Sequence, residues 1–84
     1  MNCPKILKAI PLENYQIKIL FDNNITKIYN FEENFKYDFF SPLKDYNLFK
    51  TLKVDIGGHG ISWNDDLDLS EFELWNNSIE ERGV

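Results

Sequence analysis

The sequence predicts an α+β fold, in which a curled antiparallel sheet of about five strands carries one C-terminal helix. Several short runs alternate apolar and polar residues, which is the period of a half-buried strand. Asn-rich or Gly-rich reversals separate these runs, as in hairpins. The last run changes to the helical period. We expect the 84 residues to form a single domain over residues 1–84.

The first part of the chain predicts a three-strand antiparallel meander. Residues 5–12 form the first strand, and Pro11 places it at an edge or a bend, because proline cannot donate to a sheet. Residues 15–21 form the clearest strand, and residues 25–31 form its partner. The turn at residues 22–24 joins them, since Asn tolerates the left-handed conformation of tight turns. The apolar face of the clearest strand consists of Tyr15, Ile17, Ile19 and Phe21.

The aromatic segment over residues 31–40 leaves two alternatives open. Three Phe residues recur at a helical spacing, but two further rings interrupt the stripe, so a loop pinned by aromatic side chains fits as well. These five rings are Phe31, Phe35, Phe39, Tyr37 and Phe40. Ser41 at a cap and Pro42 at a first helical position then predict the entry to a short helix or turn over residues 43–49.

The stretch from Leu52 to Glu73 predicts a hairpin. Leu52, Val54 and Ile56 alternate with polar residues as one strand, and Ile61 and Trp63 resume the alternation on the returning strand. Between them lie three glycines that allow positive φ and hence a reversal. They are Gly57, Gly58 and Gly60. A corner then leads to the last helix.

A helix is predicted over residues 71–81. Ser70 and Glu73 have the spacing of a capping box. Phe72, Trp75 and Ile79 form one apolar stripe at helical spacing, and Gly83 fits a C-terminal stop.

Charge is unevenly distributed along the chain. Residues 1–53 carry eight Lys against six acids, or +2, whereas residues 54–84 carry one Arg against eight acids, or −7. An acidic C-terminal part repels phosphate, so we expect no direct nucleic-acid binding. The acidic part is either a solvated surface or a patch for a basic partner protein. One cysteine, no signal peptide and no apolar run near the roughly 20 residues of a membrane span predict a cytoplasmic protein without membrane contact.

No catalytic constellation is evident, and we expect no enzyme activity, cofactor or metal. His59 and Cys3 have no orienting or activating partner nearby in sequence, so a turn residue and an incidental thiol are predicted. The alternating polar residues from Asn64 to Ser70 faintly resemble a calcium loop. They fail as one, because Leu69 and Trp75 occupy the positions that require Gly and Glu.

Seven residues are candidates for binding a partner, with a structural alternative for each. The aromatic cluster can be a core plug or a docking patch, Trp63 a core or an interface anchor, and the two acids a solvated corner. The candidates are Phe35, Tyr37, Phe39, Phe40, Trp63, Asp65 and Asp66.

The order of short motifs resembles the bacterial domain of unknown function family 2442 (DUF2442). The motifs are Pro11-Leu12, Phe21-Asp22, Pro42-Leu43, Phe49, Val54-Asp55, Gly60, Trp63 and Asp68-Leu69. Asn24 stands where the family usually has Gly, and Asp66 stands near where a small residue is common. The resemblance implies a curled antiparallel sheet with helices packed on it. It also implies domains that occur alone or fused to a helix-turn-helix DNA-binding domain, often encoded beside another small protein.

From the residues and the resemblance together we expect a stand-alone protein–protein interaction module. One form of this hypothesis is the antitoxin-like member of a two-gene pair, whose partner is a small protein encoded adjacently. Homodimerisation through the free edge of the strand that starts at Lys5 is a further expectation. The alternative is a small-molecule-sensing or regulatory domain, which requires a pocket of roughly 300 Å³ or more.

Overall fold

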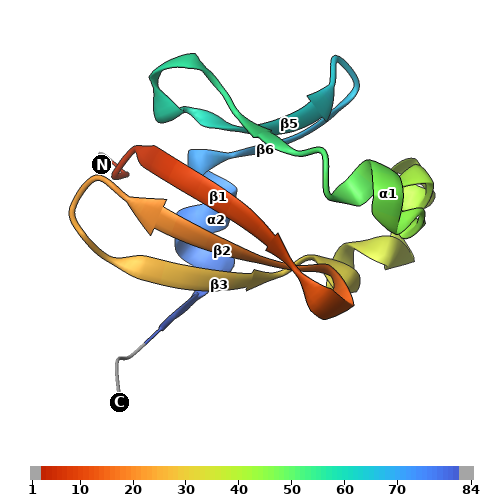
Figure 1. Cartoon of the computed structure of the whole chain (residues 1–84), viewed down its shortest axis with the longest axis horizontal. Coiled ribbons are helices and arrows are strands. Elements are labelled where there is room, and N and C mark those ends of the chain that lie inside the picture. The colour runs from red at the N-terminus through yellow and green to blue at the C-terminus, as the bar shows by residue number, and fades with distance from the viewer. Residues whose placement is uncertain (1–2, 82–84) are drawn as a thin grey trace.

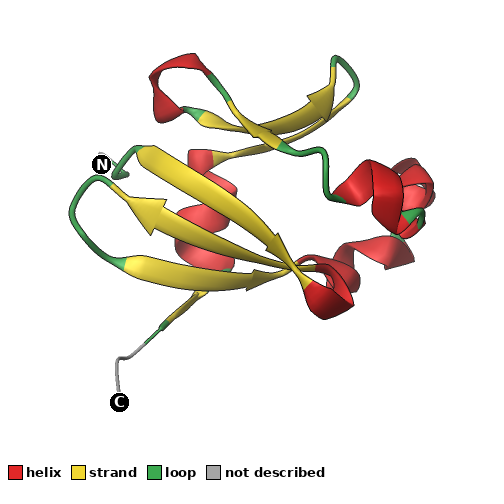
Figure 2. Ribbon diagram, viewed as in Figure 1, coloured by secondary structure: helices red, strands yellow, loops and turns green. Residues whose placement is uncertain are grey.

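The computed structural model describes residues 3–81 and contains two antiparallel sheets (Figure 1). The four-stranded sheet has the order β1-β2-β3-β7, and the three-stranded sheet has the order β4-β5-β6. Their bounds are β1 Ile6–Leu12, β2 Gln16–Phe21, β3 Thr26–Asn30, β7 Ile79–Glu80, β4 Lys53–Val54, β5 Gly60–Asn64 and β6 Leu67–Ser70. Helix α2, Glu71–Asn77, packs on one face of the four-stranded sheet (Figure 2). The predicted α+β class with a C-terminal helix is confirmed.

The predicted meander is confirmed in β1, β2 and β3. Ile17, Ile19 and Phe21 on β2 are fully buried on one face. The strand starts one residue later than expected. Asn14 and Tyr15 both take positive φ in the 3-10 helix η1, Glu13–Tyr15, which reverses the chain between β1 and β2. Asn24 has φ 69°, as the predicted turn requires. Of the edge or bend that Pro11 predicts, the structure shows the edge, because β1 is the first strand in the order β1-β2-β3-β7.

The segment after β3 forms two consecutive 3-10 helices, η2 over Phe31–Lys36 and η3 over Asp38–Lys44. The predicted helix entry at Ser41-Pro42 is wrong, because Pro42 lies inside η3. Helix α1, Tyr46–Phe49, begins later, with Asp45 as its cap. The Asn47 backbone N–H donates to Asp45 Oδ1 at 3.0 Å, so the carboxylate satisfies a donor that has no partner within the helix.

The predicted hairpin is present, but its first strand is shorter than the alternation indicates. Strand β4 ends at Val54, and Ile56 starts the 3-10 helix η4, Ile56–Gly58, where its side chain is 98% exposed. Gly58 has the expected positive φ of 74°. Gly60 is required for a different reason, since a Cβ there would lie 2.5 Å from the Leu69 carbonyl oxygen.

The expected corner is the turn at Asp65 and Asp66, but it does not lead directly to the last helix, because residues 67–70 form strand β6 and pair with β5. The last helix is also shorter than predicted and ends at Asn77. Ile79 leaves the helix and pairs with Ile28 as part of β7, so the predicted stripe breaks. Leu74 is the fully buried residue of α2, whereas Phe72 is exposed. The predicted stop at Gly83 lies outside the described residues.

One hydrophobic core joins the two sheets. Its buried members come from β1, β2 and β3, from the 3-10 and α-helical segments, and from β5, β6 and α2. The largest fully buried side chains are Phe21, Phe31, Phe49, Ile17, Ile19, Leu43, Ile61 and Leu74. Between residues 3 and 81, no helix has the length and apolar character that crossing a membrane demands.

Candidate functional site

Three of the seven predicted site residues are partly buried and pack against the core. Phe35, Phe40 and Trp63 surround the buried ring of Phe31, with ring centroids between 5.2 and 5.4 Å from it. Trp63 Nε1–H also donates to the Phe49 carbonyl oxygen at 2.7 Å. Partly buried rings that pack around Phe31 and an indole N–H with a hydrogen-bond partner both stabilise a fold, which is the structural alternative for these three residues.

The other two aromatic candidates, Tyr37 and Phe39, point into solvent. Tyr37 is 53% exposed, and Lys36 Nζ lies 5.3 Å from its ring centroid. Phe39 is exposed on η3 and packs edge-on against Phe40. The aromatic segment is therefore divided: Phe35 and Phe40 pack against the core, and Tyr37 and Phe39 are exposed.

Asp65 and Asp66 lie in the exposed turn between β5 and β6. Asn64 Oδ1 accepts hydrogen bonds from the backbone N–H groups of Asp66 at 2.9 Å and Leu67 at 3.0 Å, which forms the turn. Neither of the two clefts described below includes these two acids. A solvated corner accounts for both.

An open cleft of about 400 Å³ lies where β3, η2 and α2 meet, and we call it the Tyr29–Glu73 cleft. Its floor is a hydrogen-bonded network. The Tyr29 hydroxyl donates to Glu73 Oε2 at 2.8 Å and accepts from Asn34 Nδ2 at 2.8 Å, and Asn77 Nδ2 donates to Glu73 Oε1 at 2.9 Å. The lining residues are Tyr29, Asn30, Glu33, Asn34, Lys36, Tyr37, Glu73 and Asn77.

Acidic side chains outnumber basic ones in the lining of this cleft. Burial raises the pKa of the Tyr29 phenol well above its ordinary value, and the hydrogen bond to Glu73 acts in the same direction. The Tyr29 hydroxyl is the donor of the hydrogen bond to the Glu73 carboxylate. The lining contains two acidic side chains, Glu33 and Glu73, and one basic side chain, Lys36.

A second cleft of about 390 Å³ continues from the first along β3 and β7. The two share Asn30, Glu33 and Asn77. The second is also lined by Ile28, Ile79, Glu80, Glu81 and Gln16. Sequence reasoning missed both clefts, because the first forms where η2 meets α2 and the second depends on β7 pairing with β3. The only available signal was the excess of acids after residue 53.

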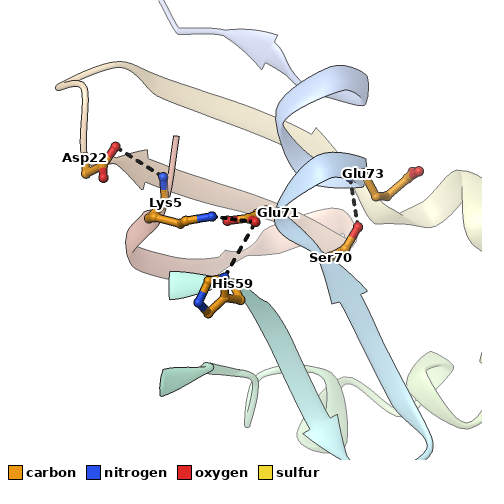
Figure 3. Close-up of polar contacts among 6 residues, drawn as sticks. All are labelled: Lys5, Asp22, His59, Ser70, Glu71 and Glu73. Carbon is orange, nitrogen blue, oxygen red and sulfur yellow. Dashed lines mark hydrogen bonds and ion pairs between the residues drawn. The ribbon is translucent and has the colours of Figure 1, made fainter. Parts of the chain in front are cut away.

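A second polar cluster ties three segments together at the start of α2 (Figure 3). Glu71 Oε1 accepts from Lys5 Nζ at 2.8 Å and lies 3.6 Å from His59 Nδ1. The hydrogen bond from Lys5 is the main cause that lowers the pKa of Glu71. Its other oxygen, Oε2, is buried without a hydrogen-bond partner among the described residues.

This cluster has the character of a structural clamp. His59 is exposed, as predicted for a turn residue, although sequence reasoning missed its acidic neighbour. None of Lys5, His59 and Glu71 lines either of these two clefts, and the His59 side chain is 65% exposed. Between residues 3 and 81, no group of three or more His, Cys, Asp or Glu side chains is placed to hold a metal ion.

Fold and surface together define a small α+β domain that combines two antiparallel sheets with an open, acidic surface cleft. The family model described as "Protein of unknown function (DUF2442)" matches residues 6–80 of the 84-residue chain, and the chain belongs to this family. The resemblance drawn from its motifs is thereby confirmed. Neither the curated proteins nor the solved structures contain a match to it.

Proposed function

We propose that this protein is a protein–protein interaction module that holds a positively charged segment of its partner in the Tyr29–Glu73 cleft. The observation that carries the proposal is the acidic, hydrogen-bonded floor of an open cleft with a half-exposed tyrosine, Tyr37, in its lining. Carboxylates bind Lys and Arg side chains through charge-assisted hydrogen bonds. Tyrosine is a frequent anchor at protein interfaces.

The shape of the cleft favours a chain segment over an enclosed ligand. Small-molecule sites are usually concave and mostly apolar. Here the lining of the Tyr29–Glu73 cleft is dominated by Asn, Glu and Tyr side chains. An open and polar cleft suits a basic segment of a protein chain that lies along it.

We further propose that the partner is a small protein encoded by an adjacent gene, and that the pair acts as toxin and antitoxin-like member. The gene arrangement implied by the family resemblance supports this form of the hypothesis. It predicts that expression of the neighbour alone slows growth, and that co-expression of this chain restores growth. Unchanged growth in both cultures would reject the toxin–antitoxin form.

A second candidate is a sensing domain for a small cationic molecule. It is favoured by one observation, that the cleft volume of about 400 Å³ exceeds the roughly 300 Å³ that a ligand site needs. Polyamines such as spermidine are suitable probes. Saturable binding of a polyamine, with no complex formed by the neighbouring protein, would replace the interaction module with this candidate.

The decisive experiment is titration calorimetry of the purified chain with the neighbouring protein. Tyr37→Ala and Glu73→Gln should each weaken binding by about tenfold or more, since each removes an anchor or a charge from the cleft. Two matched variants lie outside the cleft: Phe39→Ala removes an exposed ring, and Asp65→Asn removes an exposed charge. Affinity should also fall as salt increases. Equal losses in cleft and control variants would contradict the proposed site.

A further inference from the structure

The four-stranded sheet has one face away from the core, which we call the outer face. Helix α2 lies behind the strands in Figure 1, so the outer face is turned toward the viewer. The strand register places a row of side chains across it: Ile10 opposite Lys18, Lys18 opposite Ile28, and Ile28 opposite Ile79. These residues alternate with the buried Ile17 and Tyr29, and therefore point outward.

The two ends of this row are apolar and exposed. Ile10 on β1 is 39% exposed and Ile79 on β7 is 78% exposed, while Ile28 between them is half-buried. Ile28 and Ile79 are neighbours in the row, whereas Lys18 separates Ile28 from Ile10. Exposed apolar side chains on a sheet face mark a surface that gains from being covered.

The next row across the same face carries opposite charges at its two ends. Lys8 on β1 pairs with Leu20, and Leu20 pairs with Thr26. Glu81 follows β7 in the same row, because its backbone N–H donates to the Thr26 carbonyl oxygen at 2.8 Å. The outer face therefore carries one cation, Lys8, at its β1 edge and one anion, Glu81, at its β7 edge.

We propose that this outer face binds a second copy of the same chain, about a two-fold axis parallel to the strands. Such an axis exchanges the two edges and keeps the rows in register. It places Ile10 of one copy over Ile79 of the other, and Lys8 over Glu81. Every contact then occurs twice, as a closed two-fold interface requires.

The polarity of the face selects a second copy over a foreign basic segment. A basic segment would be attracted to Glu81 but repelled by Lys8 and Lys18. A second copy instead places its Glu81 near Lys8 and its Lys8 near Glu81, so that opposite charges meet at both edges. Lys18 Nζ already lies 3.1 Å from Glu81 Oε1, so the Lys8 of the second copy would join an existing ion pair.

The face also suits dimerisation better than the edge of β1 does. Tyr46 Oη–H donates to the Leu12 carbonyl oxygen at 3.0 Å at one end of that edge. At the other end Gly58 packs so closely that a Cβ atom there would lie 2.5 Å from the Ile6 carbonyl oxygen. A second strand along β1 would have to displace both contacts, whereas the outer face needs no such change.

The small footprint of the face predicts a weak dimer. Four strands spaced about 4.8 Å apart and a few residues rising about 3.3 Å each cover little area. Stable interfaces bury upwards of about 1,200 Å² in total. We therefore expect a dissociation constant in the micromolar range, which sedimentation equilibrium measures directly.

Sedimentation of the wild-type chain should show a reversible monomer–dimer equilibrium. Ile79→Asp should raise the dissociation constant by about tenfold or more, because it places a charge in the apolar row. Ile56→Asp is the matched control: it makes the same change at a 98% exposed isoleucine on η4, away from the outer face, and should leave the constant unchanged. Circular dichroism verifies that both variants are folded.

A charge exchange tests the two-fold geometry itself. Lys8→Glu and Glu81→Lys should each weaken the dimer. The double variant should recover most of the loss, since opposite charges would again face each other across the interface at these two positions. A monomer at every concentration, equal effects of the two isoleucine variants, or no recovery in the double variant would each overturn the proposal. The cleft variants Tyr37→Ala and Glu73→Gln test the proposed function separately, because those residues do not lie on the outer face.

Discussion

At the scale of single residues, Glu71 connects the most distant parts of the chain. Its carboxylate joins Lys5, before β1, to His59, which follows η4, and it does so from the first turn of α2. The negative charge is also favourably placed at the N-terminus of a helix. Removing the Glu71 carboxylate therefore removes contacts of the segment before β1, of the segment after η4 and of α2 at the same time.

The lowered pKa of Glu71 predicts a specific loss of stability in acid. Its ordinary value is 4.5, and the hydrogen bond from Lys5 lowers it in the folded state. A lowered carboxyl pKa contributes stability that is present above 4.5 and is lost as the pH falls through the lower folded value. In Glu71→Gln, the free energy of unfolding should depend less on pH below 4.5 than in the wild type.

Lys5→Met should flatten the same part of the curve, because it removes the donor that lowers this pKa. Urea unfolding at a series of pH values gives the free energies, and carbon-13 NMR titration of the Glu71 carboxyl gives its pKa. Parallel curves for the wild type and both variants would show that the clamp does not couple protonation to folding.

At the scale of elements, helix caps explain where the two α-helices begin. Ser70 Oγ accepts the Glu73 backbone N–H at 3.1 Å and starts α2. The reciprocal half of the predicted capping box is replaced, because the Glu73 carboxylate accepts from Tyr29 and Asn77. One residue thereby serves both the helix start and the floor of the cleft.

Removing a true cap should cost stability, whereas removing a false one should not. Ser70→Ala and Asp45→Ala should each lower the free energy of unfolding by about 1 kcal/mol. Ser41→Ala is the control, because Ser41 is exposed inside η3 and caps no helix; its effect should stay within about 0.5 kcal/mol. Chemical denaturation measures all three. A larger loss for Ser41→Ala would restore the helix entry predicted at Ser41-Pro42.

Elements that depend on local signals could be predicted from the sequence, and elements that depend on distant pairing could not. The alternation of apolar and polar residues predicted β2, and Asn24 predicted the turn after it, because both signals lie within a few residues. The stripe predicted over Phe72, Trp75 and Ile79 was wrong because Ile79 pairs with Ile28, far away in sequence. No local pattern distinguishes a helical position from a two-residue strand.

The sequence predicted aromatic and acidic residues as candidates for a site, but it did not predict which of them line the cleft. Aromatic residues between 35 and 40 were recognised, yet only the structure separates Phe35 and Phe40, which face Phe31, from Tyr37, which lines the cleft. The acids of the cleft come from η2 and α2, which approach each other only after the meander and the C-terminal helix have packed. The excess of acids after residue 53 predicted an acidic surface, but not where on the molecule that surface lies.

At the scale of the whole molecule, the two sheets share a single core. The Cα radius of gyration is 12.1 Å, close to the roughly 12 Å expected for a compact chain of this length. Phe31 and Phe49 contact Trp63 of β5, while Phe21 of β2 contacts Trp75 of α2. All of these rings belong to the core cluster or pack against it.

A shared core predicts that both sheets unfold in one cooperative transition. Trp63 reports on the three-stranded sheet and the aromatic cluster, and Trp75 reports on the packing of α2 against the four-stranded sheet. The variants Trp63→Phe and Trp75→Phe leave one tryptophan each. Within each variant, urea unfolding followed by fluorescence should coincide with unfolding followed by far-ultraviolet circular dichroism, in both midpoint and slope. Because the two probes are compared within one variant, the stability that Trp63→Phe loses with the Trp63 hydrogen bond does not affect the comparison. Separate midpoints for the two probes would mean that the sheets fold as independent units, and that the Phe31 cluster does not couple them.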